Sequence, residues 1–283
     1  MDAHTPAYIE TPPSQRLEKI VECYWKLEFA DGANAPTESI FPDGCTELIF
    51  NLADPFRRFH ANGEIEIQPK ILLVGQMKEH AAIQPTGRVR LFGVRFKPGG
   101  LFPILQTPIS EVTNQIIDSK IILGRFSAEL EEQLHACETF NECIRLTESC
   151  LLARLRFNSA PDAIIDTLAE RIIQTGGRVS IEALTRDIGL SHRQIERSFR
   201  KRVGISPKLF ARIIRFQTVF NALDHGSVNW SQIALGCGYY DQAHLIRDFK
   251  TFSGASPGAF LTSQVELTAF FMRKNRTSFF YNT

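Results

Sequence analysis

The sequence lacks long apolar runs, closely spaced cysteines and any strong compositional bias. No stretch approaches the ~18–20 consecutive apolar residues of a membrane-spanning helix, and residues 1–20 contain no basic segment followed by an apolar one. The six cysteines include no CxxC pair, which argues against a disulfide framework and a zinc site. We interpret most of them as buried thiols. The 283 residues, 43% hydrophobic and 22% charged, predict a cytoplasmic globular protein with no membrane segment, bound metal or cofactor.

Charge is distributed unevenly along the chain, although the net charge is only +1. Residues 1–160 contain 16 basic and 21 acidic residues, whereas residues 161–261 contain 13 basic and 9 acidic residues. The last segment, 262–283, contains 3 basic residues and 1 acidic residue. A basic C-terminal half favours a polyanionic partner, and the acidic N-terminal half does not. The two halves therefore have different partners.

The N-terminal half has the period-two pattern of β-strands. Apolar and polar residues alternate over 21–29, and further strands are expected over 46–52, 64–68, 71–75 and 89–96. Turn signals such as Pro42-Asp43-Gly44 separate these runs. Their number and spacing predict a small β-barrel or a sandwich, and we expect the barrel.

After residue 100 the pattern becomes helical. Helices are expected over 126–137 and 141–157, and the second has an apolar face that includes Ile144, Leu151 and Leu155. This face either supports the barrel or forms the seam of a homodimer. A turn-rich segment at 158–161 marks a boundary. The expected organisation is a sensor or dimerisation domain at 1–158, a helical domain at 162–261 and a tail of unknown role at 262–283.

The helical half repeats itself at an offset of 50 residues. The segment 197–210 matches 247–260 in register at six of fourteen positions, where Arg, Phe, Gly, Ser, Pro and Phe recur. Ser191 and Asp241 also correspond, and both residue types favour the N-cap position of a helix. We expect each repeat to begin a helix at this point.

Each repeat has the features of a helix-turn-helix unit. A short helix, expected over 181–187 in the first unit and 230–235 in the second, precedes a glycine-containing turn and the capped helix. At 100° per residue, Ile195 and Phe199 share one face of the second helix while Arg193 and Arg197 lie on the other. The apolar face is expected to pack inward, and the polar face is free to read bases in the major groove of DNA.

Residues 162–261 resemble the C-terminal domain of the AraC/XylS family of bacterial transcriptional regulators. The segments GLSHRQIERSFRKRVGISP and IALGCGYYDQAHLIRDFKTFSGASPGAF carry the resemblance. The N-terminal segments PDGCTELIF and GVRFKPGG are similar to a cupin-like sensor domain of some members. The resemblance implies a DNA-binding regulator whose partners are duplex DNA, a small-molecule effector, a second copy of the chain and, for an activator, RNA polymerase.

The contacts to DNA follow from side-chain chemistry on the outer helix faces. Arginine favours guanine, glutamine favours adenine, and a methyl group touches the thymine methyl. Other basic groups position the domain on phosphates. The expected base contacts are Arg193, Glu196, Arg197, Gln242, Ala243, His244 and Arg247. The expected phosphate contacts are Arg200, Lys201 and Lys250.

The N-terminal half contains four residues that we consider for a ligand pocket: Trp25, Glu47, Arg90 and Arg95. A barrel of this size can enclose one small ligand. The alternative is that Trp25 belongs to the core and both arginines lie on a solvated face. A separate alternative is that this half is a ligand-free dimerisation or protein-interaction module rather than a sensor. A small-molecule enzyme is a third alternative, but no catalytic set is recognisable.

One apparent catalytic motif lies in the second repeat. Residues 254–258 fit the pattern GxSxG of a nucleophile elbow, which requires a preceding strand and an amide after the serine. A helix precedes this segment, and Pro257 follows Ser256 and has no amide hydrogen. We therefore expect no catalytic residues and no enzymatic activity.

A fragment of residues 162–261 is expected to bind duplex DNA, because both predicted reading helices lie within it. Binding should weaken with salt, with a log–log slope of about −0.9 per neutralised phosphate. Fluorescence anisotropy at several salt concentrations measures both quantities. A fragment that fails to bind at low salt, while the full chain binds, contradicts the autonomy of the domain.

Overall fold

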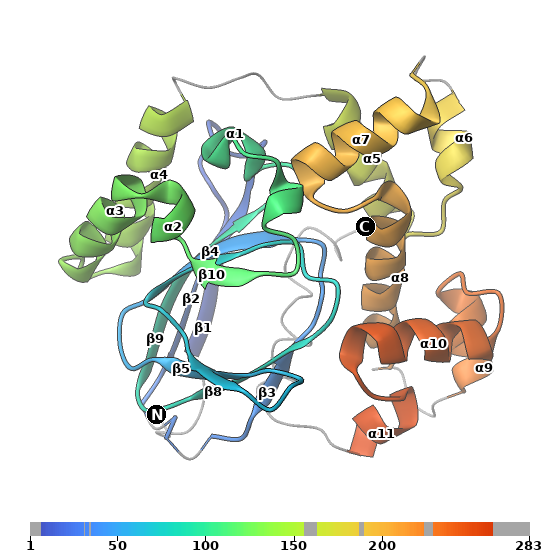
Figure 1. The fold of residues 1–283 in the computed structure, drawn as a ribbon, viewed down its shortest axis with the longest axis horizontal. Coiled ribbons are helices and arrows are strands. Elements are labelled where there is room, and N and C mark those ends of the chain that lie inside the picture. The colour runs from blue at the N-terminus through green and yellow to red at the C-terminus, as the bar shows by residue number, and fades with distance from the viewer. Residues whose placement is uncertain are drawn as a thin grey trace.

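The computed structural model describes residues 7–30, 32–33, 35–155, 163–186, 190–223 and 229–262. A β-rich N-terminal domain is followed by a helical C-terminal domain (Figure 1). The boundary at 158–161 and the tail after residue 262 lie outside the described residues, so the predicted domain limits stay predictions.

Two antiparallel sheets form the N-terminal domain. The larger sheet has the strand order β1-β2-β9-β4-β7-β10, and the smaller has the order β3-β8-β5-β6. Within the described residues no ladder joins their edge strands, so the sheets are not closed into the barrel that we expected, although a cupin-like jelly roll is compatible with them. The strands are β1 (Ala7–Thr11), β2 (Val21–Phe29), β3 (Glu38–Ile40), β4 (Thr46–Asn51), β5 (Phe56–Phe59), β6 (Ile65–Ile67), β7 (Ile71–Val74), β8 (Ala81–Pro85), β9 (Val89–Phe96) and β10 (Ile116–Asp118).

The period-two pattern located the long strands and two short ones, β6 and β7, but missed the other short strands. β2 and β9 have the bounds expected from the sequence, and β4, β6 and β7 lie within their expected ranges. The additional strands β1, β3, β5, β8 and β10 have three to five residues each. Alternation over so few residues is not distinguishable from chance, and pairing with longer neighbours decides their structure.

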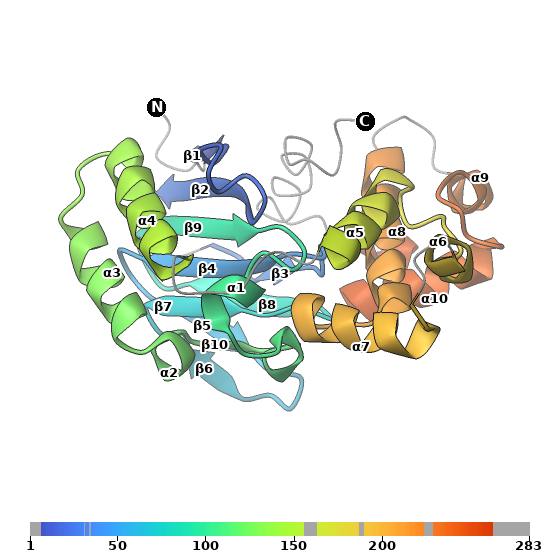
Figure 2. The ribbon, with the colours of Figure 1, turned by 90° about the horizontal axis from the view of Figure 1, so that it is seen from above.

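The helices that follow β10 cover one end of the sheets, on the side away from the C-terminal domain (Figure 2). Ile144 and Leu151 of α4 are buried in the hydrophobic core together with Phe50 and Phe92. The apolar face of this helix therefore supports the β-domain, which was the first of the two alternatives. The helices and the 3-10 turn of this half are α1 (Phe102–Leu105), η1 (Ile109–Glu111), α2 (Lys120–Leu123), α3 (Arg125–His135) and α4 (Phe140–Leu155).

The C-terminal domain contains the two predicted units, joined by the 17-residue helix α8. Its core contains large aromatic residues that are fully buried, among them Phe199, Phe210, Phe216, Phe249 and Phe252. The helices are α5 (Ala163–Gln174), α6 (Ile181–Arg186), α7 (His192–Val203), α8 (Pro207–Leu223), α9 (Trp230–Gly236), α10 (Gln242–Ser253) and α11 (Pro257–Thr262).

The two domains share an aromatic contact. The ring of Phe41, from the segment between β3 and β4, lies 6.2 Å from Phe216, 6.0 Å from Phe220 and 5.8 Å from Phe260. Beside it, the side-chain amide of Gln217 donates a hydrogen bond to the carbonyl oxygen of Pro42. The N-terminal domain thus packs directly onto the helix that joins the two units.

Phe41→Ala is expected to destabilise the full chain. Truncation of a fully buried phenylalanine costs about 3–5 kcal/mol, and we expect about 2 kcal/mol for this partly buried one. Urea unfolding measures the loss. Ile65→Ala is the control, because Ile65 is 57% exposed and a surface change stays within about 0.5 kcal/mol. Equal stability of the two variants would contradict the role of the contact.

Candidate DNA-binding surface

The first reading helix, α7, begins with a complete capping box. The Ser191 hydroxyl accepts a hydrogen bond from the backbone amide of Gln194 at 3.3 Å, and the Gln194 side chain accepts one from the Ser191 amide at 2.9 Å. These bonds satisfy amides that have no partner within the helix. The predicted N-cap is confirmed, and the helix ends at Gly204 with a φ of 101°.

The second reading helix, α10, begins in the same way. The Asp241 carboxylate accepts a hydrogen bond from the backbone amide of His244 at 2.7 Å. The helix ends at Gly254, where φ is 76°. Both caps and both terminal glycines keep the offset of 50 residues, so the repeat in the sequence is a repeat of the structure.

The division of each helix into an inner and an outer face is confirmed. Ile195 and Phe199 are buried on α7, and Leu245 and Phe249 are buried in the same positions on α10. The outer faces of the same helices carry exposed basic groups. Because buried and exposed residues follow the helical period, the orientation of each helix is fixed by its own sequence.

Residues of α7 and its N-cap line an open hollow of about 470 Å³. Arg193 and Arg197 are exposed there, and Glu196 lies 3.4 Å from Arg200 through its Oε1 atom and the arginine Nη2. The structure therefore brings together the three predicted base contacts of the first unit and one predicted phosphate contact. The lining residues are Ser191, Arg193, Gln194, Glu196, Arg197 and Arg200.

Some predicted base contacts of the second unit are exposed, whereas others also contact neighbouring side chains. Ala243 and Arg247 are exposed. Gln242 accepts a hydrogen bond from the Ser231 hydroxyl at 2.9 Å, which joins α9 to α10. The half-buried ring of His244 packs against Tyr239 with 5.1 Å between ring centroids. Arg247 is thus an exposed cation on this surface, whereas His244 also contributes to packing.

The three predicted phosphate contacts are all exposed, and one of them also contacts the N-terminal domain. Lys250 and Arg200 lie on exposed faces of their helices. The ammonium group of Lys201 instead lies 5.5 Å from the ring centroid of Phe102. Phe102 belongs to the N-terminal domain, so Lys201 is placed at the junction of the two domains.

The sequence analysis missed an ion pair that orients the second reading helix. Arg212 of α8 donates from Nη2 to the Asp248 carboxylate of α10 at 2.7 Å, and Asp248 is only 3% exposed. The bond fixes α10 against the helix that joins the units. The residues are 36 positions apart and lie in different helices, so no local spacing could have revealed the pair.

Three of the four candidates for a ligand pocket contact one another in a buried cluster, and the fourth lies apart from them. Arg95 donates to Glu47 at 2.8 Å, and the Trp25 indole donates to the same carboxylate at 3.1 Å. Burial alone lowers the pKa of Arg95, but the charges of Glu47 and Asp43 outweigh it and raise this pKa well above its usual value. Trp25, Glu47 and Arg95 therefore bind one another. Arg90 lies elsewhere, 3.5 Å from Glu28.

The cysteines near this cluster are unreactive thiols. Burial raises the pKa of Cys23 to about 12 and that of Cys45 well above its usual range. Thiolates are the reactive form, so neither side chain is a nucleophile at neutral pH. Cys143 and Cys237 are buried as well, which confirms the interpretation of most cysteines as buried thiols.

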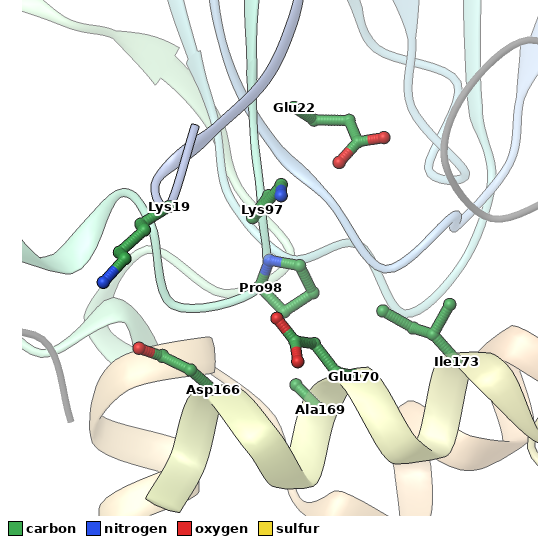
Figure 3. A pocket seen from close by; sticks show the side chains of 8 residues that line it. All are labelled: Lys19, Glu22, Lys97, Pro98, Asp166, Ala169, Glu170 and Ile173. Atoms are coloured by element: carbon green, nitrogen blue, oxygen red, sulfur yellow. The ribbon is translucent and has the colours of Figure 1, made fainter. Parts of the chain in front are cut away.

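A small cavity lies between the domains (Figure 3). Asp166, Glu170 and Ile173 of α5 face Lys19 and Lys97 of the N-terminal domain across it. Its volume is about 40 Å³, far below the roughly 300–1,000 Å³ of a ligand pocket. The cavity has space for water molecules but not for an effector of ordinary size.

Residues 184–263 match a family described as a helix-turn-helix domain. The match begins within α6 and continues past the end of α11, so it includes both capped helices. The chain carries an AraC-type DNA-binding domain. It is therefore a DNA-binding transcription regulator, as the resemblance implied. In the described part of this regulator, none of the helices has the length and apolar character needed to cross a bilayer.

The N-terminal domain of the regulator matches a different family. Residues 9–118 match a domain of unknown function, DUF6597. This match extends from β1 to the last residue of β10 and includes both sheets. The description of this family assigns no ligand, so the role of the domain depends on its own contacts. No curated protein matches the chain.

Solved structures show remote similarity to the regulator. ToxT from Vibrio cholerae O395 is 11% identical with a TM-score of 0.44, and the alignment covers 81% of this chain and 94% of ToxT. The AraC-like transcriptional activator CuxR is 14% identical with a TM-score of 0.27, over 78% of this chain and 88% of that protein. Similarity at this level does not transfer a ligand or a target.

Asp241→Ala is expected to destabilise the protein by about 1 kcal/mol, because the amide of His244 loses its acceptor. Asp241→Asn is the matched control, since asparagine caps helices about as well as aspartate. Thermal unfolding of both variants measures the difference. Equal losses would show that the negative charge at this position matters rather than the cap hydrogen bond.

Proposed function

We propose that the chain is a sequence-specific regulator whose two helix-turn-helix units read successive major grooves on one face of the DNA. The observation that carries this proposal is the duplicated, capped helix with an exposed basic face. The connecting helix α8 supports it, since 17 residues at 1.5 Å each form a spacer of about 25 Å. Successive grooves on one face are about 34 Å apart, which two reading helices at the ends of such a spacer can reach.

Base recognition is assigned to outer-face positions in the N-terminal halves of the two reading helices. In the first unit, Arg193 and Arg197 suit guanine, and Glu196 accepts from a cytosine amino group. In the second, Arg247 suits guanine and Gln242 suits adenine, and the Ala243 methyl contacts thymine. His244 supplies a polar edge beside them.

Phosphate contacts are assigned to Arg200 and Lys250, which lie on exposed helix faces. Lys201 keeps this assignment only if it leaves the ring of Phe102 when DNA binds. The N-terminal domain then affects DNA affinity directly, because the Lys201 ammonium group contacts either Phe102 or a DNA phosphate.

The remaining assignments concern the N-terminal domain, taken as residues 1–158. We propose that it modulates residues 162–261 through the contacts around Phe41, in response to a small-molecule effector. The protein acts in the cytoplasm as a homodimer, contacts RNA polymerase where it activates, and has no catalytic activity. The packing of Phe41 on α8 supports communication between the domains.

Arg193→Ala and Arg247→Ala are each expected to weaken binding to the specific site by about 1–3 kcal/mol, because each removes a bidentate contact to guanine. Each should also relax base preference, at different positions of the site. Selection of bound duplexes from a random pool, followed by titration of the selected DNA, measures both effects.

Lys250→Ala is the matched control for these variants, since it also removes one positive charge from an exposed helix face. It should weaken specific and non-specific DNA alike and reduce the salt slope by about 1. If the arginine variants behave in the same way, they contact phosphate and the assignment of base contacts is wrong.

A further inference from the structure

The C-terminal ends of both reading helices abut the N-terminal domain. α7 ends at Gly204 and α10 at Gly254, which are equivalent positions of the repeat, and both glycines have positive φ. Each helix has 12 residues and is about 18 Å long, so these ends lie far from the N-terminal positions that would read bases. Contacts at these ends position the helices without occupying the reading surface.

At the end of α7 the contact includes a hydrogen bond. The hydroxyl of Thr113, between η1 and β10, donates to the carbonyl oxygen of Gly204 at 2.7 Å. A Cβ atom on Gly204 would lie 2.9 Å from Ile109 Cγ2 and 3.3 Å from Gln76 Cγ. The glycine is therefore needed both for its positive φ and for the close approach of the N-terminal domain.

At the end of α10 the contact is made by His80. A Cβ atom on Gly254 would lie 2.4 Å from Cε1 of the His80 ring. Nδ1 of His80 is buried and has no hydrogen-bond partner among the described residues. The ring is thus placed by packing against the helix end rather than by a polar bond.

One short segment, residues 76–80, supplies contacts to both helix ends. It is held at several points: the Gln76 side chain donates to the Gly44 carbonyl at 2.7 Å, and the Asn114 amide donates to the Gln76 carbonyl at 2.8 Å. The Lys78 amide also donates to the Asn114 side chain at 3.0 Å. Four residue steps span at most about 14 Å, so the segment is short as well as held in place by these hydrogen bonds.

We propose that residues 76–80, together with Ile109 and Thr113, form a brace that fixes the relative position of the two reading helices and thereby determines the spacing between their DNA half-sites. Without the brace, the two units are related by α8 and its packing, by the contact of Phe41 with Phe260, and by the hydrogen bond from Arg178 to the Gly236 carbonyl. This inference rests on the proposed function, because it requires that both units read DNA. Thr113 and His80 are positioning residues for that recognition.

The test uses the full chain and duplexes that it selects from a random pool. The selected paired site is compared with versions that have one or two base pairs inserted between the half-sites, and with a single half-site. One inserted base pair rotates the second half-site by about 35°. The variant is Thr113→Val combined with His80→Ala. His60→Ala is the matched control, because His60 follows β5, pairs with Glu66 of β6 and is not among the nearest neighbours of Gly204 or Gly254.

The wild-type chain and His60→Ala should lose at least tenfold in affinity when one base pair is inserted, since simultaneous engagement of linked sites contributes roughly 10²–10⁴. The double variant should lose less than about threefold in affinity for this duplex, because units without the brace can turn to match the rotated half-site. Its affinity for the single half-site should stay unchanged. Restoring the hydroxyl with Thr113→Ser should recover part of the discrimination.

Two results with the double variant would overturn the brace. In the first, the double variant keeps the full spacing preference. In the second, it loses affinity equally on every duplex, the single half-site included, which would mark Thr113 and His80 as residues that only stabilise the fold. If the wild-type chain itself selects only single half-sites, the proposed two-groove reading fails, and the brace fails with it. The selection of duplexes by the wild-type chain, without any variant, distinguishes this outcome from a failure of the brace alone.

Discussion

Burial of Phe216 is the interaction on which the arrangement of the whole molecule depends. This residue of α8 is fully buried, and its ring contacts Phe220 at 4.9 Å, Phe252 at 5.2 Å and Phe249 at 5.4 Å between centroids. Phe41 of the N-terminal domain closes the same cluster at 6.2 Å. Aromatic pairs of this kind contribute about 0.5–1.5 kcal/mol each beyond the area that they bury. One side chain thus joins the spacer helix, the second reading helix and the N-terminal domain.

The distribution of charge complements this apolar junction. Two ion pairs with buried members, Arg212 with Asp248 and Arg95 with Glu47, hold interior charges together, because an unpaired charge in the interior is strongly destabilising. The reading faces instead keep Arg193 exposed to solvent. The buried ion pairs hold helices and strands together, whereas the exposed cations of the reading faces remain available to a polyanion.

The sequence alone predicted the parts of the fold that depend on neighbours along the chain. The N-caps Ser191 and Asp241 were predictable because a cap hydrogen bond joins residues three positions apart. The buried positions Ile195 and Leu245 were predictable because a helix repeats every 3.6 residues. The long strands followed from alternation, whereas most of the short ones, such as β10, did not, since three residues carry no period.

The duplicated helix-turn-helix pattern and the chemistry of its outer faces were therefore determined by the sequence itself. Only the tertiary structure decided that Phe41 enters the core of the other domain, that Lys201 lies over Phe102, and that Thr113 reaches the end of α7. It also decided that the β-domain consists of two sheets that no ladder joins within the described residues, an arrangement compatible with a cupin-like jelly roll. The contacts of Phe41, Lys201 and Thr113 join residues 91 to 175 positions apart, and such pairings follow from how whole domains pack rather than from any local spacing of residues.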